Sequence, residues 1–161
     1  MNDPAFEQFV RDTHQKALRL AFDWLGDWEE ARDAVQESFI RAHEKLDQYK
    51  GTSSFSTWYY RILANHLKDR LRRRKVRRFF TLFSLDEEKD AHEGLACGPG
   101  PGEELEAGSL RKELTRAVGQ LPSRQGEVFR MKSLTAMTFA EIAETLGISD
   151  GAAKTHYGRA V

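Results

Sequence analysis

Apolar residues in the first half of the chain recur every three or four positions, which is the spacing of one face of an α-helix. The first run predicts a helix from Pro4 to about Leu25, and Gly26 then interrupts the pattern. Asp27 can cap a second helix through its side-chain oxygen. The apolar face of this second helix consists of Trp28, Ala31, Val35, Phe39, Ala42 and Leu46.

A third helix is predicted after Gly51, where hydroxyl residues at 52–54 offer N-caps. Its apolar stripe consists of Phe55, Tyr59, Ile62, Leu63, His66, Leu67 and Leu71. A second face with helical spacing carries Trp58, Arg61, Asn65, Lys68 and Arg72. Residues 61–78 hold nine basic residues and one acid, a net charge of +8.

This third helix has the features of a nucleic-acid-binding element. Lysine and arginine attract phosphates without reading base sequence. A free aromatic ring and an amide can stack on unpaired bases and hydrogen-bond to them. The sequence therefore favours a helix that holds separated strands. The alternative is a solvated basic helix end with a tryptophan in the core, because a charge run is often only exposed surface.

The helical patterns stop between residues 81 and 108. Residues 84–108 carry eight acids against one lysine, together with several glycines and few large apolar residues. Such a segment buries too little apolar surface to fold, so we expect a flexible acidic linker over residues 81–108. A loop of this length is uncommon inside one compact domain. The sequence therefore predicts an all-α fold with two small helical domains, residues 1–80 and 109–161.

The second domain carries the pattern of a helix-turn-helix. Thr138 and Glu141 fit a capping box, and Gly147 stands where a left-handed residue ends a helix. Ser149 can cap a last helix that follows directly. Two short helices joined by such a turn often place the second one in the DNA major groove. A helical hairpin used only for packing is the alternative.

Composition limits the remaining function classes. The 161 residues include 25 basic and 25 acidic ones, so charge is segregated along the chain rather than present in excess. The single cysteine, Cys97, cannot form an internal disulfide. No apolar run approaches the roughly 18 residues of a membrane span and no signal peptide is recognised, so we expect a cytoplasmic protein. The five histidines are scattered, and no metal-ligand spacing, phosphate loop or catalytic triad is found. Neither an enzyme nor a cofactor is therefore expected.

The second helix differs from the third in its charge. Residues 23–44 hold seven acids and two arginines, a balance of −5. An acidic helix face should not bind DNA, but it can meet a basic protein partner. An ordinary solvated helix face fits the same pattern.

Five segments of the chain carry a family resemblance. They are EARDAVQESFIRA at 30–42, the 53–74 stretch, LPSRQ at 121–125, FAEIA at 139–143 and GISDG at 147–151. Their order and spacing resemble the extracytoplasmic-function (ECF) class of bacterial RNA polymerase sigma factors, over nearly the whole chain. In that family the first domain (region two) binds polymerase and melts the −10 promoter element. The last domain (region four) reads the −35 element as duplex.

The resemblance implies a transcription initiation factor and a role for individual residues. The implied partners are core RNA polymerase (the β′ clamp helices and the β flap), promoter DNA and an anti-sigma factor. Contacts with core polymerase would come from Asp33, Gln36, Glu37 and Ile40. Contacts with the −10 element would come from Trp58, Arg61, Asn65, Lys68, Arg70, Arg72, Arg73 and Arg74. Contacts with the −35 element would come from Arg124, Lys154, Thr155, His156 and Arg159. Asn65 is the expected base contact, because an amide both donates and accepts.

Two departures from the family pattern concern the last helix. Gly158 lies inside it, and the family continues with basic residues beyond the position of Val161. Either the helix is shortened here, or binding to the −35 element is weak. The rival hypothesis is a conventional helix-turn-helix regulator that binds duplex DNA alone as a dimer. Such a regulator would not require the acidic helix or a tryptophan beside Asn65. A protein-only adaptor would leave the +8 cluster unexplained.

Overall fold

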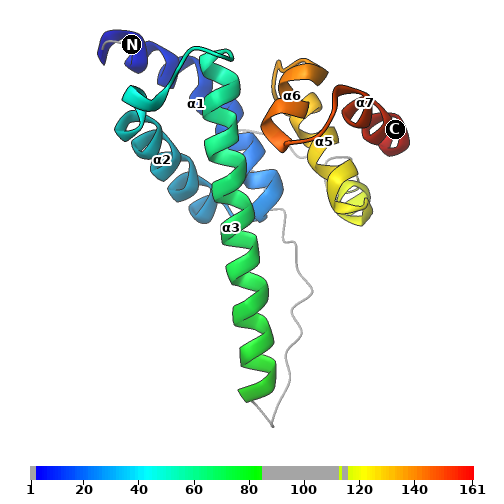
Figure 1. Ribbon diagram of the computed structural model, residues 1–161. Coiled ribbons are helices and arrows are strands. Elements are labelled where there is room, and N and C mark those ends of the chain that lie inside the picture. Colours follow the sequence, from blue (N-terminus) through cyan, green and yellow to red (C-terminus); the bar gives the residue numbers. More distant parts are fainter. Residues whose placement is uncertain (1–2, 85–112, 114–115) are drawn as a thin grey trace.

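The computed structural model describes residues 3–84, 113 and 116–161. Every regular element in these ranges is helical, which confirms the all-α fold class (Figure 1). Within the same ranges, no helix has the length and apolar character that crossing a membrane requires. The linker was predicted over residues 81–108, but residues 81–84 are still part of the helix that ends at Ser84. From residue 85 onward the predicted linker lies outside the described residues, and so does Cys97.

The first domain consists of α1 (Asp3–Leu25), α2 (Trp28–Glu44), the short 3-10 helix η1 (Leu46–Gln48) and α3 (Phe55–Ser84). Asp27 caps α2 as predicted, because its carboxylate accepts the backbone N–H of Glu30 at 2.8 Å. α1 and α2 pack against the N-terminal part of α3, and the C-terminal part of α3 extends beyond them (Figure 1). The largest fully buried apolar residues of this domain include Leu20, Val35, Tyr59, Leu63 and Leu67.

A buried hydroxyl pair joins α2 to α3. Tyr59 is fully buried, and its hydroxyl lies 2.9 Å from that of Ser38, which donates to the Val35 carbonyl oxygen at 2.7 Å. The Tyr59 ring also stacks on Phe39 with centroids 4.5 Å apart. Burial raises the pKa of Tyr59 far above its ordinary value, so the phenol stays neutral and donates to Ser38. This contact joins α3 to α2 within the core.

The second domain contains α5 (Ser123–Leu134), α6 (Phe139–Leu146) and α7 (Asp150–Ala160). The predicted capping box is confirmed, since Thr138 and Glu141 bond each other's backbone N–H groups. Gly147 ends α6 with φ +66°, the left-handed conformation expected of a glycine there. Ser149 caps α7 through the Ala152 N–H at 3.1 Å. The helix-turn-helix is therefore formed as its sequence predicts.

The two domains lie against each other. α6 packs on α3, and α5 packs on α1 (Figure 1). At the second of these contacts, the Arg130 guanidinium forms an ion pair with Asp23. Both side chains are mostly buried, at 18% and 23% exposed.

Candidate nucleic-acid interface

The N-terminal end of α3 is fixed by local contacts. Ser54 caps it, accepting the Thr57 N–H at 3.1 Å. Three aromatic rings meet around this turn, because Trp58 lies 5.2 Å from Phe55 and 5.4 Å from Tyr49, measured between centroids. Trp58 is half-buried, so its ring is held in place by its neighbours while part of it remains exposed.

The predicted polar face of α3 exists, and its members differ in what they contact. Asn65 is exposed. Arg72 is 76% exposed and pairs with Asp69 at 3.0 Å on its own helix. Arg61 and Lys68, in contrast, form ion pairs with glutamates of the second domain. Exposed residues and residues paired with the second domain therefore share one face.

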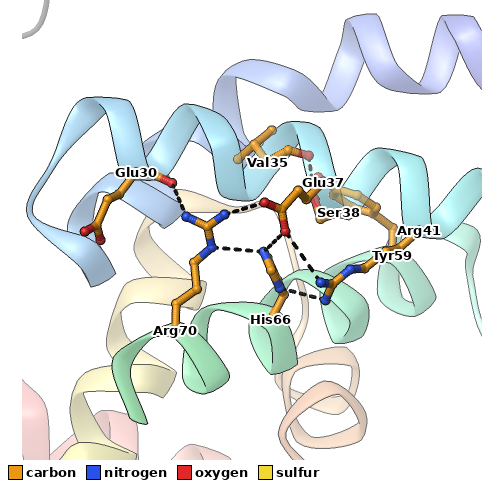
Figure 2. A network of polar contacts seen from close by, with 8 residues as sticks. All are labelled: Glu30, Val35, Glu37, Ser38, Arg41, Tyr59, His66 and Arg70. Atoms are coloured by element: carbon orange, nitrogen blue, oxygen red, sulfur yellow. Dashed lines mark hydrogen bonds and ion pairs between the residues drawn. The ribbon is translucent and has the colours of Figure 1, made fainter. Parts of the chain in front are cut away.

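A second group of basic residues on α3 turns toward α2 instead. Arg70 Nη2 lies 2.6 Å from Glu37 Oε1, and Arg70 Nη1 donates to the Glu30 carbonyl oxygen at 3.4 Å (Figure 2). Arg74 donates to the Leu25 carbonyl oxygen at 2.9 Å. These two arginines were predicted to hold DNA phosphates. The structure engages both in contacts that join α3 to the rest of the first domain.

A buried histidine lies at the centre of this network (Figure 2). Arg41 Nη1 lies 2.7 Å from His66 Nδ1, and Glu37 Oε2 lies 3.1 Å from His66 Nε2. Arginine can only donate, so Nδ1 accepts from Arg41. His66 Nε2 lies between the Glu37 carboxylate and a second arginine donor, Arg70 Nε, at 3.2 Å. Burial, and next the charge of Arg41, lower the pKa of His66, so the ring stays neutral.

The space between α2 and α3 beside this network forms a pocket of about 280 Å³. Arg73 and Arg77 line it together with the charged residues of the network. Of the predicted −10 residues, Arg73 is thus placed on the same side of α3 as Arg70 and Arg74. Among the residues that the structure describes, no group of three or more His, Cys, Asp or Glu side chains is placed to hold a metal ion.

The predicted polymerase-binding residues occupy the outer side of α2. Asp33 and Gln36 are exposed, and Ile40 is half exposed, an unusual position for a large aliphatic side chain. Glu37 differs, because its carboxylate faces Arg70 and His66 while 45% of its side chain remains exposed. Asp33, Gln36 and Ile40 therefore form one exposed group on α2. Glu37 instead takes part in the contacts with α3.

The predicted −35 residues lie mainly on α7. Lys154, Thr155 and Arg159 are exposed, and His156 is half-buried. Lys154 pairs with Asp150 at 2.6 Å, and the Thr155 hydroxyl donates to the Gly151 carbonyl oxygen at 2.8 Å. Arg124 lies elsewhere, on α5, where it donates to Glu127 at 3.1 Å.

Known proteins share both halves of this architecture. Residues 9–77 match the family model for Sigma-70 region 2, and residues 111–161 match that for Sigma-70, region 4. The chain is 33% identical to the ECF RNA polymerase sigma factor SigW of Bacillus subtilis, over 96% of this chain and 85% of SigW. The chain belongs to the ECF class of sigma-70 family factors.

Two solved structures share the fold of this sigma factor. CnrH, in complex with the cytosolic domain of CnrY, aligns with a TM-score of 0.70 and 22% identity, over 99% of this chain and 84% of CnrH. The sigma factor RpoE of Bartonella quintana, in complex with the anti-sigma factor NepR, aligns with a TM-score of 0.69 and 22% identity, over 96% and 92% of the two chains.

As a member of this family, the sigma factor is a transcription initiation factor that directs RNA polymerase to promoters. The region 2 match covers most of the first domain and the region 4 match covers the second. The alternative of a stand-alone helix-turn-helix regulator is not favoured, since it would account for the second domain alone.

Sequence reasoning missed several residues that contact the predicted DNA face. Glu127, Glu141 and Glu144 of the sigma factor reach α3 from 59 to 87 positions away in the sequence. No local pattern marks such contacts. Arg41 was also missed, although its spacing of four residues from Glu37 is a signal that could have found their pair on α2.

Proposed function

We propose that the sigma factor holds the unpaired strand of the −10 element on the polar face of α3, while the outer side of α2 binds core RNA polymerase. One observation carries this proposal. Trp58, Asn65 and Arg72 lie on one side of α3, with an aromatic ring, an exposed amide and an exposed guanidinium in succession. These are the groups suited to stacking, to base recognition and to phosphate attraction.

The proposed roles follow from what each side chain can do. Extruding a base from the duplex costs roughly a few kcal/mol, while stacking on an aromatic ring returns roughly 1–3 kcal/mol per base. Trp58 is already held by Phe55 and Tyr49, so little side-chain freedom is lost when a base stacks on it. Asn65 would then contact the edge of a base, and Arg72 a phosphate.

We also propose specific partners for the other surfaces. The exposed Asp33, Gln36 and Ile40 on α2 would meet the β′ clamp helices, since an acidic face with one apolar residue suits a basic protein partner. The second domain would meet the β flap, and its α7 residues Lys154 and Arg159 would face the −35 major groove. An anti-sigma factor is a further partner, by analogy with the NepR complex of RpoE.

The proposed division of the chain keeps the predicted bounds of residues 1–80, 81–108 and 109–161, except that the first domain extends to the end of α3 at Ser84. The family matches over residues 9–77 and 111–161 support it, because the unmatched stretch between them coincides with the glycine-rich acidic segment. We propose that the protein acts in the cytoplasm, where polymerase and promoter are found, and that it carries out no chemistry of its own.

The strand-binding role is tested by measuring permanganate reactivity of −10 thymines in holoenzyme assembled with W58A or N65A. Each variant should reduce open-complex formation by about tenfold, the effect of losing roughly 1.4 kcal/mol of base contact. Q8A, which removes an exposed amide from α1, is the matched control and should melt the promoter normally. If neither α3 variant affects melting while core binding is retained, the assignment of this face is wrong.

The polymerase-binding role is tested separately by core association. D33K should weaken binding of the sigma factor to core polymerase, and the effect should shrink as salt is added. E44Q, which changes an exposed acid near the end of the same helix, is the control. Failure of the unmodified protein to bind core at low ionic strength would refute the proposed function as a whole.

A further inference from the structure

Three carboxylates of the second domain lie along the polar face of α3. The first belongs to Glu141, whose two oxygens do different things. Oε2 accepts the Thr138 N–H within the capping box at 2.8 Å. Oε1 accepts the hydroxyls of Ser54 and Thr57 on α3, each at 3.2 Å. The backbone N–H of Thr138, and the hydroxyls of Thr138, Thr57 and Ser54, hold the pKa of this carboxyl below its usual value. Glu141 therefore meets α3 as an anion.

The other two carboxylates pair with basic residues farther along the same helix. Glu144 Oε1 lies 2.7 Å from Arg61 Nη2, with both side chains about 40% exposed. Glu127 Oε2 lies 3.2 Å from Lys68 Nζ, with the glutamate only 12% exposed. The contacts thus run from Ser54, which caps α3, to Lys68 within the helix.

This stretch of α3 is the one that carries the proposed strand-binding side chains. Trp58 and Asn65 lie between the points where the glutamates attach, on the same helical face. A carboxylate shares with a phosphate its negative charge and its acceptor oxygens, and arginine binds both in the same way. The second domain therefore places anionic oxygens along α3 where a strand would place phosphates.

The packed arrangement also conflicts with simultaneous binding of both promoter elements. Elements centred about 25 base pairs apart are separated by roughly 85 Å of B-form duplex, at 3.4 Å per pair. In this structure α6 is in direct contact with α3, and α5 with α1. The second domain must leave the first before each can reach its own element.

We propose that the polar face of α3 is a shared docking surface, which binds either the glutamates of the second domain or a single DNA strand. In the isolated chain, Glu127 and Glu144 bind Lys68 and Arg61 of this face. Glu141 binds Thr57 beside it, while Asn65 remains exposed. A DNA strand can bind there only after the second domain has moved away. This inference rests on the proposed function, because it requires that α3 is the strand-binding helix.

The test compares the full-length protein with its E127Q/E144Q variant, both without polymerase. Two measurements are made at low salt: the radius of gyration by X-ray scattering, and the affinity for a labelled single-stranded −10 oligonucleotide by fluorescence anisotropy. Glutamine keeps the size of each side chain and removes its charge. E44Q/E113Q, which neutralises two exposed glutamates outside the contact, is the matched control for net charge.

The variant should expand and bind the oligonucleotide about fivefold more tightly than the control, which is the combined effect of two partly exposed ion pairs. The inference is overturned if the variant binds no better than the control, or if it expands without any gain in affinity. Wild-type holoenzyme is assayed in parallel for promoter melting. If the wild-type holoenzyme melts the promoter but the E127Q/E144Q variant gains no affinity for the oligonucleotide, only the shared docking surface is refuted. If the holoenzyme does not melt the promoter, the proposed function itself is refuted.

Discussion

Arg70 and Arg72 stand two residues apart on α3, and the structure predicts opposite consequences for replacing them. Arg70 is 23% exposed and contacts Glu37 and the Glu30 carbonyl oxygen. Arg72 is 76% exposed and pairs only with Asp69 in its own helix among the contacts described. Both were predicted to bind phosphates, so glutamine variants of the two separate a structural role from a DNA-binding one.

The expected magnitudes follow from these surroundings. R70Q should lower the free energy of unfolding by about 1–2 kcal/mol, because it removes a charge-assisted bond to a half-exposed carboxylate and the additional contact with the Glu30 carbonyl oxygen. R72Q should change it by less than about 0.5 kcal/mol, as expected for an exposed pair. Urea unfolding of the two variants beside the unmodified protein measures both quantities.

The salt dependence of DNA binding provides the second measurement. If Arg72 neutralises one phosphate of a single strand, R72Q should reduce the slope of log affinity against log salt by about 0.7 in holoenzyme binding to a −10 strand. R70Q should leave that slope unchanged. The reasoning is refuted if R70Q is as stable as R72Q, or if R70Q alone reduces the slope.

Three further predictions concern other contacts. S38A should lower the free energy of unfolding by about 1–3 kcal/mol, because it leaves the buried Tyr59 hydroxyl without a partner. Y59F should cost less, because Ser38 keeps its bond to the Val35 carbonyl oxygen. Equal effects of the two variants in urea unfolding would contradict this. G158A should raise that free energy by about 0.5–1 kcal/mol, because Gly158 is helical and a Cβ there meets open space, so an unchanged thermal midpoint would count against it. Since the pKa of His66 is lowered in the folded protein, the unfolded chain binds the proton first. Stability is then complete above the ordinary value of about 6.5 and falls as the pH drops below it. H66Q should lose this part of the pH dependence, and an ordinary pKa for His66 in an NMR titration would argue against the geometry with Arg41.

The features that the sequence predicted correctly are those encoded over short distances. The cap at Asp27, the box of Thr138 and Glu141, and the turn at Gly147 each depend on residues within four positions of one another. The apolar stripe of α3 also placed His66 on the core-facing side, where it is 6% exposed. Periodicity is sufficient for such assignments, because it determines which side of a helix a residue occupies.

The sequence did not separate the arginines of α3 that face α2 from those that face the second domain or solvent. Arg70 and Arg74 follow His66 at spacings of four and eight, so they lie on its side of α3, and this spacing was a usable signal. Their partners on α2 depend on tertiary packing. The contacts of Arg61 and Lys68 with the second domain depend on packing between domains, which no local pattern reports.

The two oxygens of Glu141 have a genetic consequence. One stabilises the helix-turn-helix and the other attaches that unit to α3, so any replacement of this residue weakens the fold and the attachment together. Glu144 contributes only to the attachment, because its one described contact is with Arg61. A selection for variants that bind the −10 strand without core polymerase should therefore recover changes at position 144 repeatedly, and changes at position 141 seldom.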